Sequence, residues 1–548
     1  MKKIAKFLIV LGMMGQLSSC DYLDIVPDER AQESDTWKTE GAVRGYLYSC
    51  YGYLPANRTF GNSYWLAEEL TAVTKELFTT FKYGYYSPVS LGFTSNTWST
   101  IWNGIHQCYM FQESLKQVSN EYVTDEMKKQ YLAESNFLIA YYHFLSMRSY
   151  GPTMIIRSVI DLETPISGFP ERSSIDEVVA FINEKLDEAM SEGGLPTTWS
   201  GKDYGRATRL AALALKSRVY LYAASPLYNG NTEMYADFRS PLDGRQLIAQ
   251  EKSQAKWEIS ATQTKYAIDE VEKAKFHLYH DADAGEPSDA KPGLPNKAQR
   301  RLRYTNIDNQ TGNNPEIIWA DTRNDDYYGI QRRCPPRQTL GGKFAGISMT
   351  NCPTLQTIEA FYTKNGLPIN KDKTFDYDER YEYISAPENC DGNNYEDLVK
   401  YANFTPSSDK VMRLCTDREP RFYAWTTYHN GYFEFGKYNN EEISADPAKR
   451  AIRIHLLRDD PHGRGNRTDQ EYSISGFGNK KGVVPSAEWN VIEYPFPLFR
   501  LAELYLNYAE ALVELDRLSE AKVYLDKVRE RAGIPSVDEA WDKYSTNP

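Results

Sequence analysis

The motifs that usually carry catalytic or cofactor chemistry are missing from this chain of 548 residues, and histidine is scarce, with 7 residues. The sequence has no His-Glu-x-x-His zinc helix, no Gly-x-Ser-x-Gly elbow, no Walker loop and no Gly-x-Gly-x-x-Gly turn. His277 and His280 lie three residues apart, and Asp281, Asp283 and Glu286 follow, but neither group has the spacing of a metal site. We therefore expect no enzyme activity, no catalytic metal and no cofactor, whereas calcium binding at the acidic group stays open.

A basic excess is also missing. The chain has 63 Lys and Arg against 75 Asp and Glu, a formal net charge of -12. Because binding to a phosphate backbone needs clustered basic side chains, we expect no nucleic-acid partner. Aromatic residues are plentiful instead, with 41 Tyr, 22 Phe and 10 Trp. Rings with a polar tip suit helix packing and sugar-stacking surfaces alike.

Long apolar runs are absent after residue 19, so no later segment has the pattern of a transmembrane helix. Three lysines among the first six residues precede an apolar run over residues 7–17, which is too short to cross a bilayer core of roughly 30 Å. The residues Leu-Ser-Ser before Cys20 are typical of a lipoprotein signal. We predict that residues 1–19 are removed and that lipidated Cys20 attaches a globular body, residues 20–548, to a membrane surface. An ordinary signal peptide or an uncleaved anchor helix is the alternative.

Six cysteines remain after Cys20, and an exported chain permits disulfides among them. Their wide spacing resembles neither a zinc site nor a Cys-x-x-Cys redox motif. Cys334 with Cys352, and Cys390 with Cys415, are plausible local pairs. The pairing stays open, because free buried thiols are also possible.

Helical periodicity dominates both ends of the chain beyond the signal. One stripe of alternating small and large side chains consists of Ala133, Phe137, Ala140, Phe144 and Met147. Gly151-Pro152 is expected to end this helix. The sequence predicts further helices over about 98–118, 173–190, 205–224 and 253–279.

The last predicted helical pair covers residues 501–515 and 518–528, with a turn at 516–517. Its large-small-large spacing is that of a tetratricopeptide unit, carried by Tyr505, Tyr508, Ala509, Leu512, Leu518, Ala521 and Leu525. The predicted fold class is therefore mainly α, with degenerate tetratricopeptide-like helical-hairpin repeats and little β structure.

Two blocks of repeats, about 98–280 and 496–532, flank a loop-rich insertion at about 281–495. Pro, Gly, Asn and Asp are frequent there, with strand-like runs at 316–320, 422–428 and 452–457. Trp319 and Trp425 lie in these runs and are expected in the core.

Six segments follow one another in a distinctive order: 20–24 (CDYLD), 98–105, 133–151 (AESNFLIAYYHFLSMRSYG), 205–230, 315–320 (PEIIWA) and 496–535. Together they resemble the SusD/RagB family of nutrient-binding lipoproteins. The resemblance implies a helical body without catalytic activity on the cell surface, lipid-anchored in the outer membrane. It also implies two partners: an oligosaccharide or peptide ligand, and a SusC-like TonB-dependent transporter that receives it. Family members usually continue beyond the final helical pair, so the resemblance also predicts that this C-terminal segment is missing here.

Sugar capture needs aromatic rings that stack on pyranose faces and polar side chains that bond the hydroxyls. Two loop clusters, residues 81–86 and 321–328, have that composition, and the resemblance places both regions on the ligand face. The predicted ligand-binding residues are Tyr83, Tyr85, Tyr86, Arg323, Asn324, Tyr327 and Tyr328. Trp98 is interpreted as an anchor of its repeat helix, with ligand binding at the helix mouth as the alternative.

Two other classes of function stay open, a surface glycoside hydrolase and a purely structural surface lipoprotein. A hydrolase would place two carboxyl groups roughly 5 to 10 Å apart in an enclosed cleft. A binding protein would instead show an open aromatic shelf, and a structural protein would show no aromatic hollow.

Overall fold

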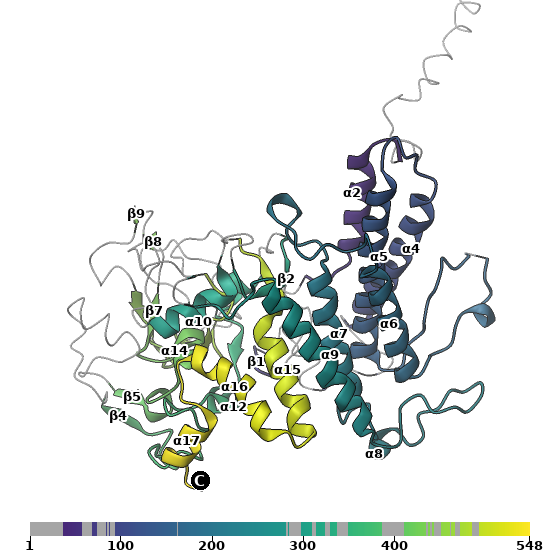
Figure 1. Ribbon diagram of the computed structural model, residues 1–548. Helices are drawn as coiled ribbons and strands as arrows, with labels where there is room; N and C mark the ends of the chain where they lie inside the picture. Colours follow the sequence, from purple (N-terminus) through teal and green to yellow (C-terminus); the bar gives the residue numbers. More distant parts are fainter. Residues whose placement is uncertain are drawn as a thin grey trace, which may run out of the picture.

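Helices dominate the fold, and the strands are short and paired two by two (Figure 1). The computed structural model describes residues 37–56, 68–73, 84, 87, 94–161, 163–280, 283, 297–308, 314–323, 329–336, 349–385, 410–434, 437–438, 441–442, 451–460, 462–465, 472–484 and 493–547. In this part of the chain, no helix combines the length and the apolar character needed to cross a bilayer. The mainly α fold class predicted from the sequence is confirmed.

The first group of helices forms a layered stack. Its members are α2 (Glu40–Tyr51), α4 (Thr94–Leu115), α5 (Asp125–Tyr150), α6 (Ile175–Ala189), α7 (Arg209–Ala224), α8 (Thr232–Tyr235) and α9 (Gln254–Lys273). α4 packs against α5, α5 against α6, α6 against α7, and α7 against α9. Each helix thus buries one face against its neighbour, as helical-repeat proteins do.

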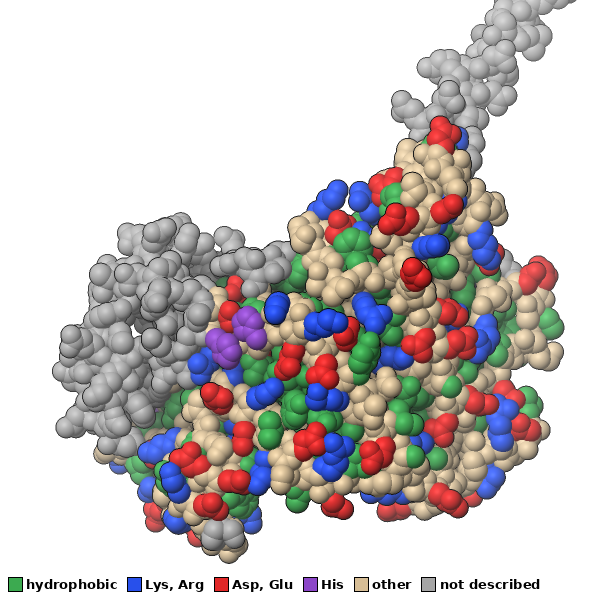
Figure 2. All heavy atoms as spheres, viewed as in Figure 1, with side chains coloured by type: hydrophobic (Ala, Val, Ile, Leu, Met, Phe, Trp, Pro, Cys, Tyr) green, Lys and Arg blue, Asp and Glu red, His purple; other side chains and the backbone are tan. Residues whose placement is uncertain are grey.

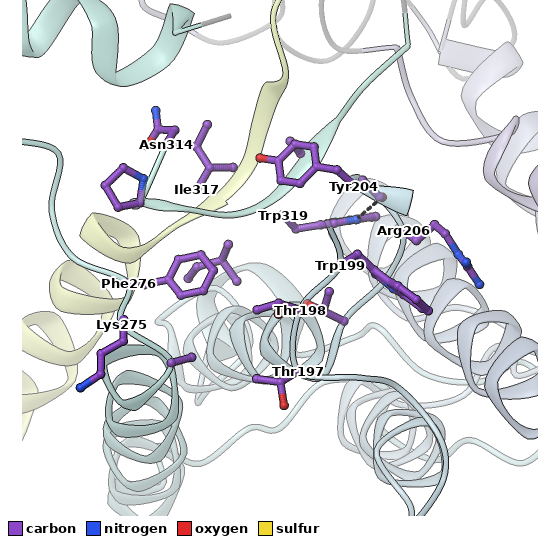
Figure 3. Close-up of a pocket in the computed structure, with 16 residues that line it drawn as sticks. Thr197, Thr198, Trp199, Tyr204, Arg206, Lys275, Phe276, Asn314, Ile317 and Trp319 are labelled. Carbon is purple, nitrogen blue, oxygen red and sulfur yellow. Dashed lines mark hydrogen bonds between the residues drawn. The ribbon is translucent and has the colours of Figure 1, made fainter. Parts of the chain in front are cut away.

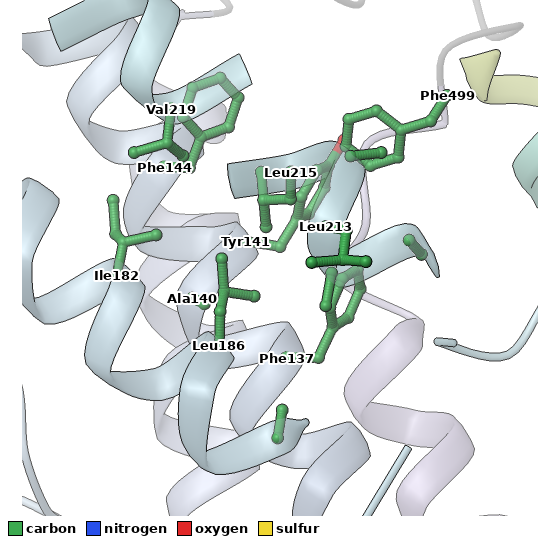
Figure 4. Close-up of a cluster of buried hydrophobic side chains, with 14 of the residues drawn as sticks. Phe137, Ala140, Tyr141, Phe144, Ile182, Leu186, Leu213, Leu215, Val219 and Phe499 are labelled. Carbon is green, nitrogen blue, oxygen red and sulfur yellow. The ribbon is translucent and has the colours of Figure 1, made fainter. Parts of the chain in front are cut away.

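α5 is the centre of this stack and is buried on all sides over Ala133–Met147. The five residues of the predicted stripe are each at most 3% exposed. Figure 4 shows Phe137, Tyr141 and Phe144 of α5 meeting side chains of α6 and α7. A helix buried all round needs partners for its polar groups. The Glu134 carboxylate accepts hydrogen bonds from the Arg206 guanidinium at 2.5 Å and from the Tyr51 hydroxyl at 2.6 Å.

The chain leaves the stack after α9 and returns to it near the C-terminus. The returning elements are β12 (Phe496–Arg500), α15 (Leu501–Glu514), α16 (Leu518–Ala532) and α17 (Val537–Tyr544). α15 packs on α9, α7 and α16. Arg218 of α7 holds Glu503 of α15 in an ion pair of 2.6 Å. The two predicted repeat blocks are therefore one continuous packing of helices.

The region between them is rich in loops. Its helices are α10 (Lys297–Ile307), α11 (Ile330–Arg333), α12 (Leu355–Ala360) and α14 (Pro420–Trp425). Its strands, with β1 (Leu70–Thr71) from earlier in the chain, are β2 (Ile317–Asp321), β3 (Cys352–Pro353), β4 (Tyr383–Ser385), β5 (Lys410–Met412), β6 (Thr426–Thr427), β7 (Tyr432–Glu434), β8 (Lys437–Tyr438), β9 (Glu441–Glu442), β10 (Ala451–Arg453) and β11 (Gly478–Asn479). The pairs are all antiparallel: β1 with β3, β2 with β12, β4 with β5, β6 with β11, β7 with β10, and β8 with β9.

Several predicted boundaries need correction. The helix expected over 253–279 ends at Lys273, because Lys275 adopts a positive φ of 72° and the N–H of Phe276 bonds back to the carbonyl of Val271. The helix expected from about residue 205 starts at Arg209, where the Thr208 side chain caps it. The strand-like run 422–428 is mostly helical, since Pro420 favours a helix start and α14 extends to Trp425.

Two further expectations concern buried groups. Trp319 is 3% exposed, which confirms its place in the core, whereas Trp425 is only partly buried at the edge of a smaller cluster. The suggested pair of Cys334 and Cys352 is not formed in the structure, because both are thiols there, as are Cys415, Cys50 and Cys108. Cys390 and Cys20 lie outside the described residues.

Charged side chains of both signs are interspersed over the surface shown in Figure 2. Among the described residues on this face, neither sign forms an extended patch.

Candidate functional site

An aromatic groove with a volume of about 500 Å³ lies beside the first turns of α4. The other wall is the chain that follows α5, residues 154–169. The groove is lined by Trp98, Ser99, Trp102, Asn103, Ile105, His106, Met154, Ile156, Ser158, Ile160, Asp161 and Phe169. We refer to this hollow as the tryptophan groove.

Three aromatic side chains give the tryptophan groove its character. Trp98 and Trp102 are four residues apart on α4, so they share one face of the helix, with ring centroids 5.3 Å apart in an edge-on arrangement. Both are half-buried. Trp98 also packs edge-on against Tyr150 at 4.9 Å, so it anchors the helix and lines the groove at the same time. Phe169, which is 48% exposed, completes the set from the opposite wall.

Polar groups of the groove are available to a ligand. Asn103 and His106 project from α4 as exposed side chains, and neither bonds to another group in the part of the chain that the structure describes. The indole Nε1 of Trp102 also has no partner among the described atoms, but it is buried and so is not itself open to a ligand. Asp161 accepts a hydrogen bond from the N–H of Glu163 at 2.8 Å through one carboxylate oxygen. Its second carboxylate oxygen has no hydrogen bond within the described part of the chain. Apolar faces beside unused donors and acceptors match the surface of a sugar ring.

His143 of α5 forms the floor beneath Trp102, with ring centroids 6.0 Å apart. Its ring also contacts Phe181 at 4.7 Å and is fully buried. Nδ1 lies 2.8 Å from the Ile139 carbonyl, and Nε2 accepts the N–H of Ile156 at 3.3 Å. Burial lowers the pKa of His143 to about 4. The histidine is therefore a neutral, two-sided hydrogen-bonding support for the groove.

A second hollow of about 290 Å³ lies where the loop before α7 meets the end of α9 and β2 (Figure 3). Trp199, Tyr204, Phe276 and Trp319 line it. Both of its indole donors are committed to the protein, since Trp319 Nε1 donates to the Gly205 carbonyl and Trp199 Nε1 to the Ala207 carbonyl, each at 2.9 Å. Burial raises the pKa of Tyr204 to about 12. The smaller volume and the satisfied donors make this hollow a weaker ligand site than the tryptophan groove.

Arg206, beside the second hollow, serves the scaffold. Its guanidinium bonds Glu134 and Asp203 and lies 4.1 Å from the Trp199 ring centroid. Burial alone would lower the pKa of Arg206, but the bond to Glu134 outweighs this effect and raises it. Burial in turn raises the pKa of Glu134 against the opposing effect of Arg206. This network fixes the start of α7 to α5.

Of the residues predicted to bind ligand, the structure describes Arg323. Its guanidinium bonds both carboxylate oxygens of Asp321, at 2.9 and 2.7 Å, and the carbonyls of Leu54 and Pro55, at 2.8 and 3.1 Å. Arg323 thus joins the end of β2 to the segment after α2. Tyr83, Tyr85, Tyr86, Asn324, Tyr327 and Tyr328 lie outside the described residues, so their roles stay predictions.

Sequence reasoning missed most of the tryptophan groove. Trp102, Asn103 and His106 carry a usable signal, because they follow Trp98 at helical spacing and would share its side of a helix. Phe169 carries no such signal. It reaches the groove through the irregular course of the chain after Gly151, which ends α5 at a φ of 72°.

The fold and its groove define a tetratricopeptide-like helical protein with an aromatic surface hollow. A family model described as "SusD family" matches residues 315–547, and a second, described as "Starch-binding associating with outer membrane", matches residues 21–221. The chain belongs to the SusD family.

Solved structures share the fold of this chain. The protein BT4246 is 29% identical, with a TM-score of 0.75 over 91% of this chain and 83% of its own. A SusD-like protein from Bacteroides fragilis is 20% identical, with a TM-score of 0.63 over 93% and 82%. A SusD-like carbohydrate binding protein from the same species is 18% identical, with a TM-score of 0.57 over 91% and 80%. A search of curated protein sequences found no match.

Proposed function

We propose that this protein is a surface lipoprotein that binds oligosaccharides, or peptides, and delivers them to a SusC-like TonB-dependent transporter in the outer membrane. Membership of the SusD family supports this function, as does the carbohydrate-binding description of a structural relative. The anchor would be lipidated Cys20. The protein would act by binding alone and would not be an enzyme.

The observation that carries the proposal is the tryptophan groove. Trp98, Trp102 and Phe169 offer ring surfaces beside the unused polar groups of Asn103 and His106. Asp161 is the one carboxylate among its described lining residues, whereas glycoside hydrolysis normally needs two. This composition favours capture of a sugar over its cleavage.

The groove is one part of a larger proposed ligand surface. The aromatic cluster at residues 81–86 ends eight positions before α4 begins at Thr94. We include Tyr83, Tyr85 and Tyr86 in the proposed surface for this reason. Asn324, Tyr327 and Tyr328 are included because they follow Arg323, which joins β2 to the segment after α2.

The first test is a screen of the chain without residues 1–20 against arrays of oligosaccharides and peptides. For a sugar that binds, Phe169→Ala is expected to weaken affinity roughly fivefold, the equivalent of about 1 kcal/mol for one lost ring contact. Phe169 suits this purpose because it is 48% exposed and its loss opens little core. Calorimetric titration gives the affinity, and thermal unfolding confirms that the variant is folded.

Tyr266→Ala is the matched control, because Tyr266 is 44% exposed on α9 and lies outside the groove. It should bind like the unmodified protein. Unchanged affinity in Phe169→Ala and in Trp98→Ala would rule out the groove as the sugar site. Loss of affinity in Tyr85→Ala or Tyr328→Ala alone would instead place the ligand on the predicted loops.

A further inference from the structure

Two buried cysteines lie on neighbouring helices near the start of the fold. Cys50 is in the last turn of α2 and Cys108 is in the middle of α4, and both are 0% exposed. α2 packs directly against α4. Neither residue belongs to the tryptophan groove or to the pairs suggested by sequence spacing.

Two contacts fix the register of these two helices. The Tyr46 ring stacks on the Phe111 ring with centroids 5.7 Å apart. Ser49 Oγ accepts a hydrogen bond from Gln107 Nε2 at 2.9 Å. In these two contacts the residue number rises along α2 while it falls along α4, so the helices are antiparallel. This register places Cys50 opposite Cys108.

The chain that directly follows α2 also lies close to α4. A Cβ atom placed on Gly104 would lie 3.0 Å from the Cβ atom of Tyr53. Burial raises the pKa of the Cys108 thiol well above its ordinary value, and a hydrogen bond with the Cys50 thiol adds to the effect. The register of α2 and α4 thus brings the two residues to the same level of the helix pair, where both are unlinked thiols in the structure.

We propose that Cys50 and Cys108 are joined by an intramolecular disulfide in the exported protein. Each thiol loses one proton, and the pair gives two electrons to a disulfide oxidant of the export compartment, which is reduced to a dithiol. Because both thiols are buried in the folded chain, the bond forms while the chain is folding. The inference rests on the proposed export of the protein but not on its ligand.

Such a bond would close a loop that contains one of the two predicted ligand-binding clusters. Residues 81–86 lie between the two cysteines in the sequence. Both ends of this segment would then be held covalently to the helical stack. Constraint of the unfolded chain is the main way in which a disulfide stabilises a fold.

The test is disulfide mapping of the full chain after export. Free thiols are blocked with N-ethylmaleimide in acid denaturant, and the digest is analysed by mass spectrometry without reduction. The expected result is one linked peptide pair that contains Cys50 and Cys108, with a mass about 2 Da below the sum of the two thiol peptides, as loss of two hydrogens requires. Finding both cysteines blocked as thiols, in chain whose Cys20 is lipidated, would overturn the inference and leave the proposed location intact.

Unfolding measurements supply a second readout. Adding a reductant to the denaturant series should lower the unfolding midpoint of the unmodified protein but leave that of Cys50→Ala/Cys108→Ala unchanged. Cys415→Ala is the matched control, since Cys415 is a buried thiol in another cluster, and it should keep the response to reductant. An equal response in the double variant and the unmodified protein would also contradict the disulfide. Mapping of the unmodified chain decides the question even if the double variant fails to fold.

Discussion

Acid should destabilise this protein through His143, the buried floor of the tryptophan groove. Burial lowers the pKa of His143 to about 4, against an ordinary value of about 6.5. The unfolded chain therefore binds a proton in a pH range where the folded chain does not. Stability is fully retained above the ordinary pKa and is lost as the pH falls toward the folded pKa.

The magnitude follows from the two pKa values. Between about pH 7 and about pH 5, proton uptake by the unfolded chain alone lowers the free energy of unfolding by about 2 kcal/mol. The folded state resists protonation for a structural reason. Nε2 already accepts the Ile156 N–H, and Lys185 and Arg157 add nearby positive charge. A second N–H on the ring would face a donor instead of an acceptor.

The assay is urea unfolding of the unmodified protein and of His143→Gln across this pH range. Glutamine keeps one donor and one acceptor but does not titrate, so the variant should lose about 2 kcal/mol less on acidification. Phe144→Leu serves as the control, because it disturbs the same buried helix without changing a titratable group. Its pH dependence should follow that of the unmodified protein. Parallel curves for His143→Gln and the unmodified protein would refute the reasoning.

Three other predictions test the scaffold by urea unfolding. Ser174→Ala removes a complete capping box at the start of α6 and should cost about 1 kcal/mol; no loss would mean that the cap is not formed in solution. Gly104→Ala places a Cβ atom 2.8 Å from the ring of buried Tyr142 on α5 and should destabilise by about 1–3 kcal/mol. Gly41→Ala meets no atom within 4 Å and should stabilise slightly, so equal effects of the two substitutions would contradict the tight packing of α4 on α5. Glu316→Gln disrupts a buried carboxylate that pairs with Arg531 and a second arginine, and should cost about 3 kcal/mol at neutral pH. Burial alone would raise the pKa of Glu316, but these arginines outweigh it and lower the pKa. The stability that the ionised carboxylate contributes should therefore be lost as the pH falls through the pKa of the folded state. A stability difference between Glu316→Gln and the unmodified protein that does not change with acid would argue against this ion-pair role.

The helical elements were the most predictable part of the molecule. The stripe from Ala133 to Met147 predicted the position of α5, and the helix predicted over about 173–190 corresponds to α6, which begins at Ile175. These signals are local, because periodicity and capping depend on residues within one or two turns. α10 was missed, since its basic sequence has few apolar residues to show a helical period.

The candidate site was predictable only in part. Trp98 was interpreted as an anchor of its repeat helix, with ligand binding as the alternative, and its partners in the groove come from two segments separated by α5. Arg323 was predicted to bind ligand because aromatic and polar residues surround it in the sequence. The structure shows its donors bonded to Asp321 and to carbonyls more than 250 positions earlier. Contacts of this length leave no local pattern in one sequence.

The sequence by itself determined the mainly helical class, the extents of the strongest helices, the export signal that we predict at the N-terminus and the family resemblance. Each of these depends on residue type and short-range spacing. The tertiary structure alone decided that α15 completes the stack begun by α4, that Phe169 faces Trp98 across a groove, and that Cys50 faces Cys108. Those outcomes depend on how buried surfaces of distant segments fit together, because side chains far apart in the chain become neighbours only when the core is packed.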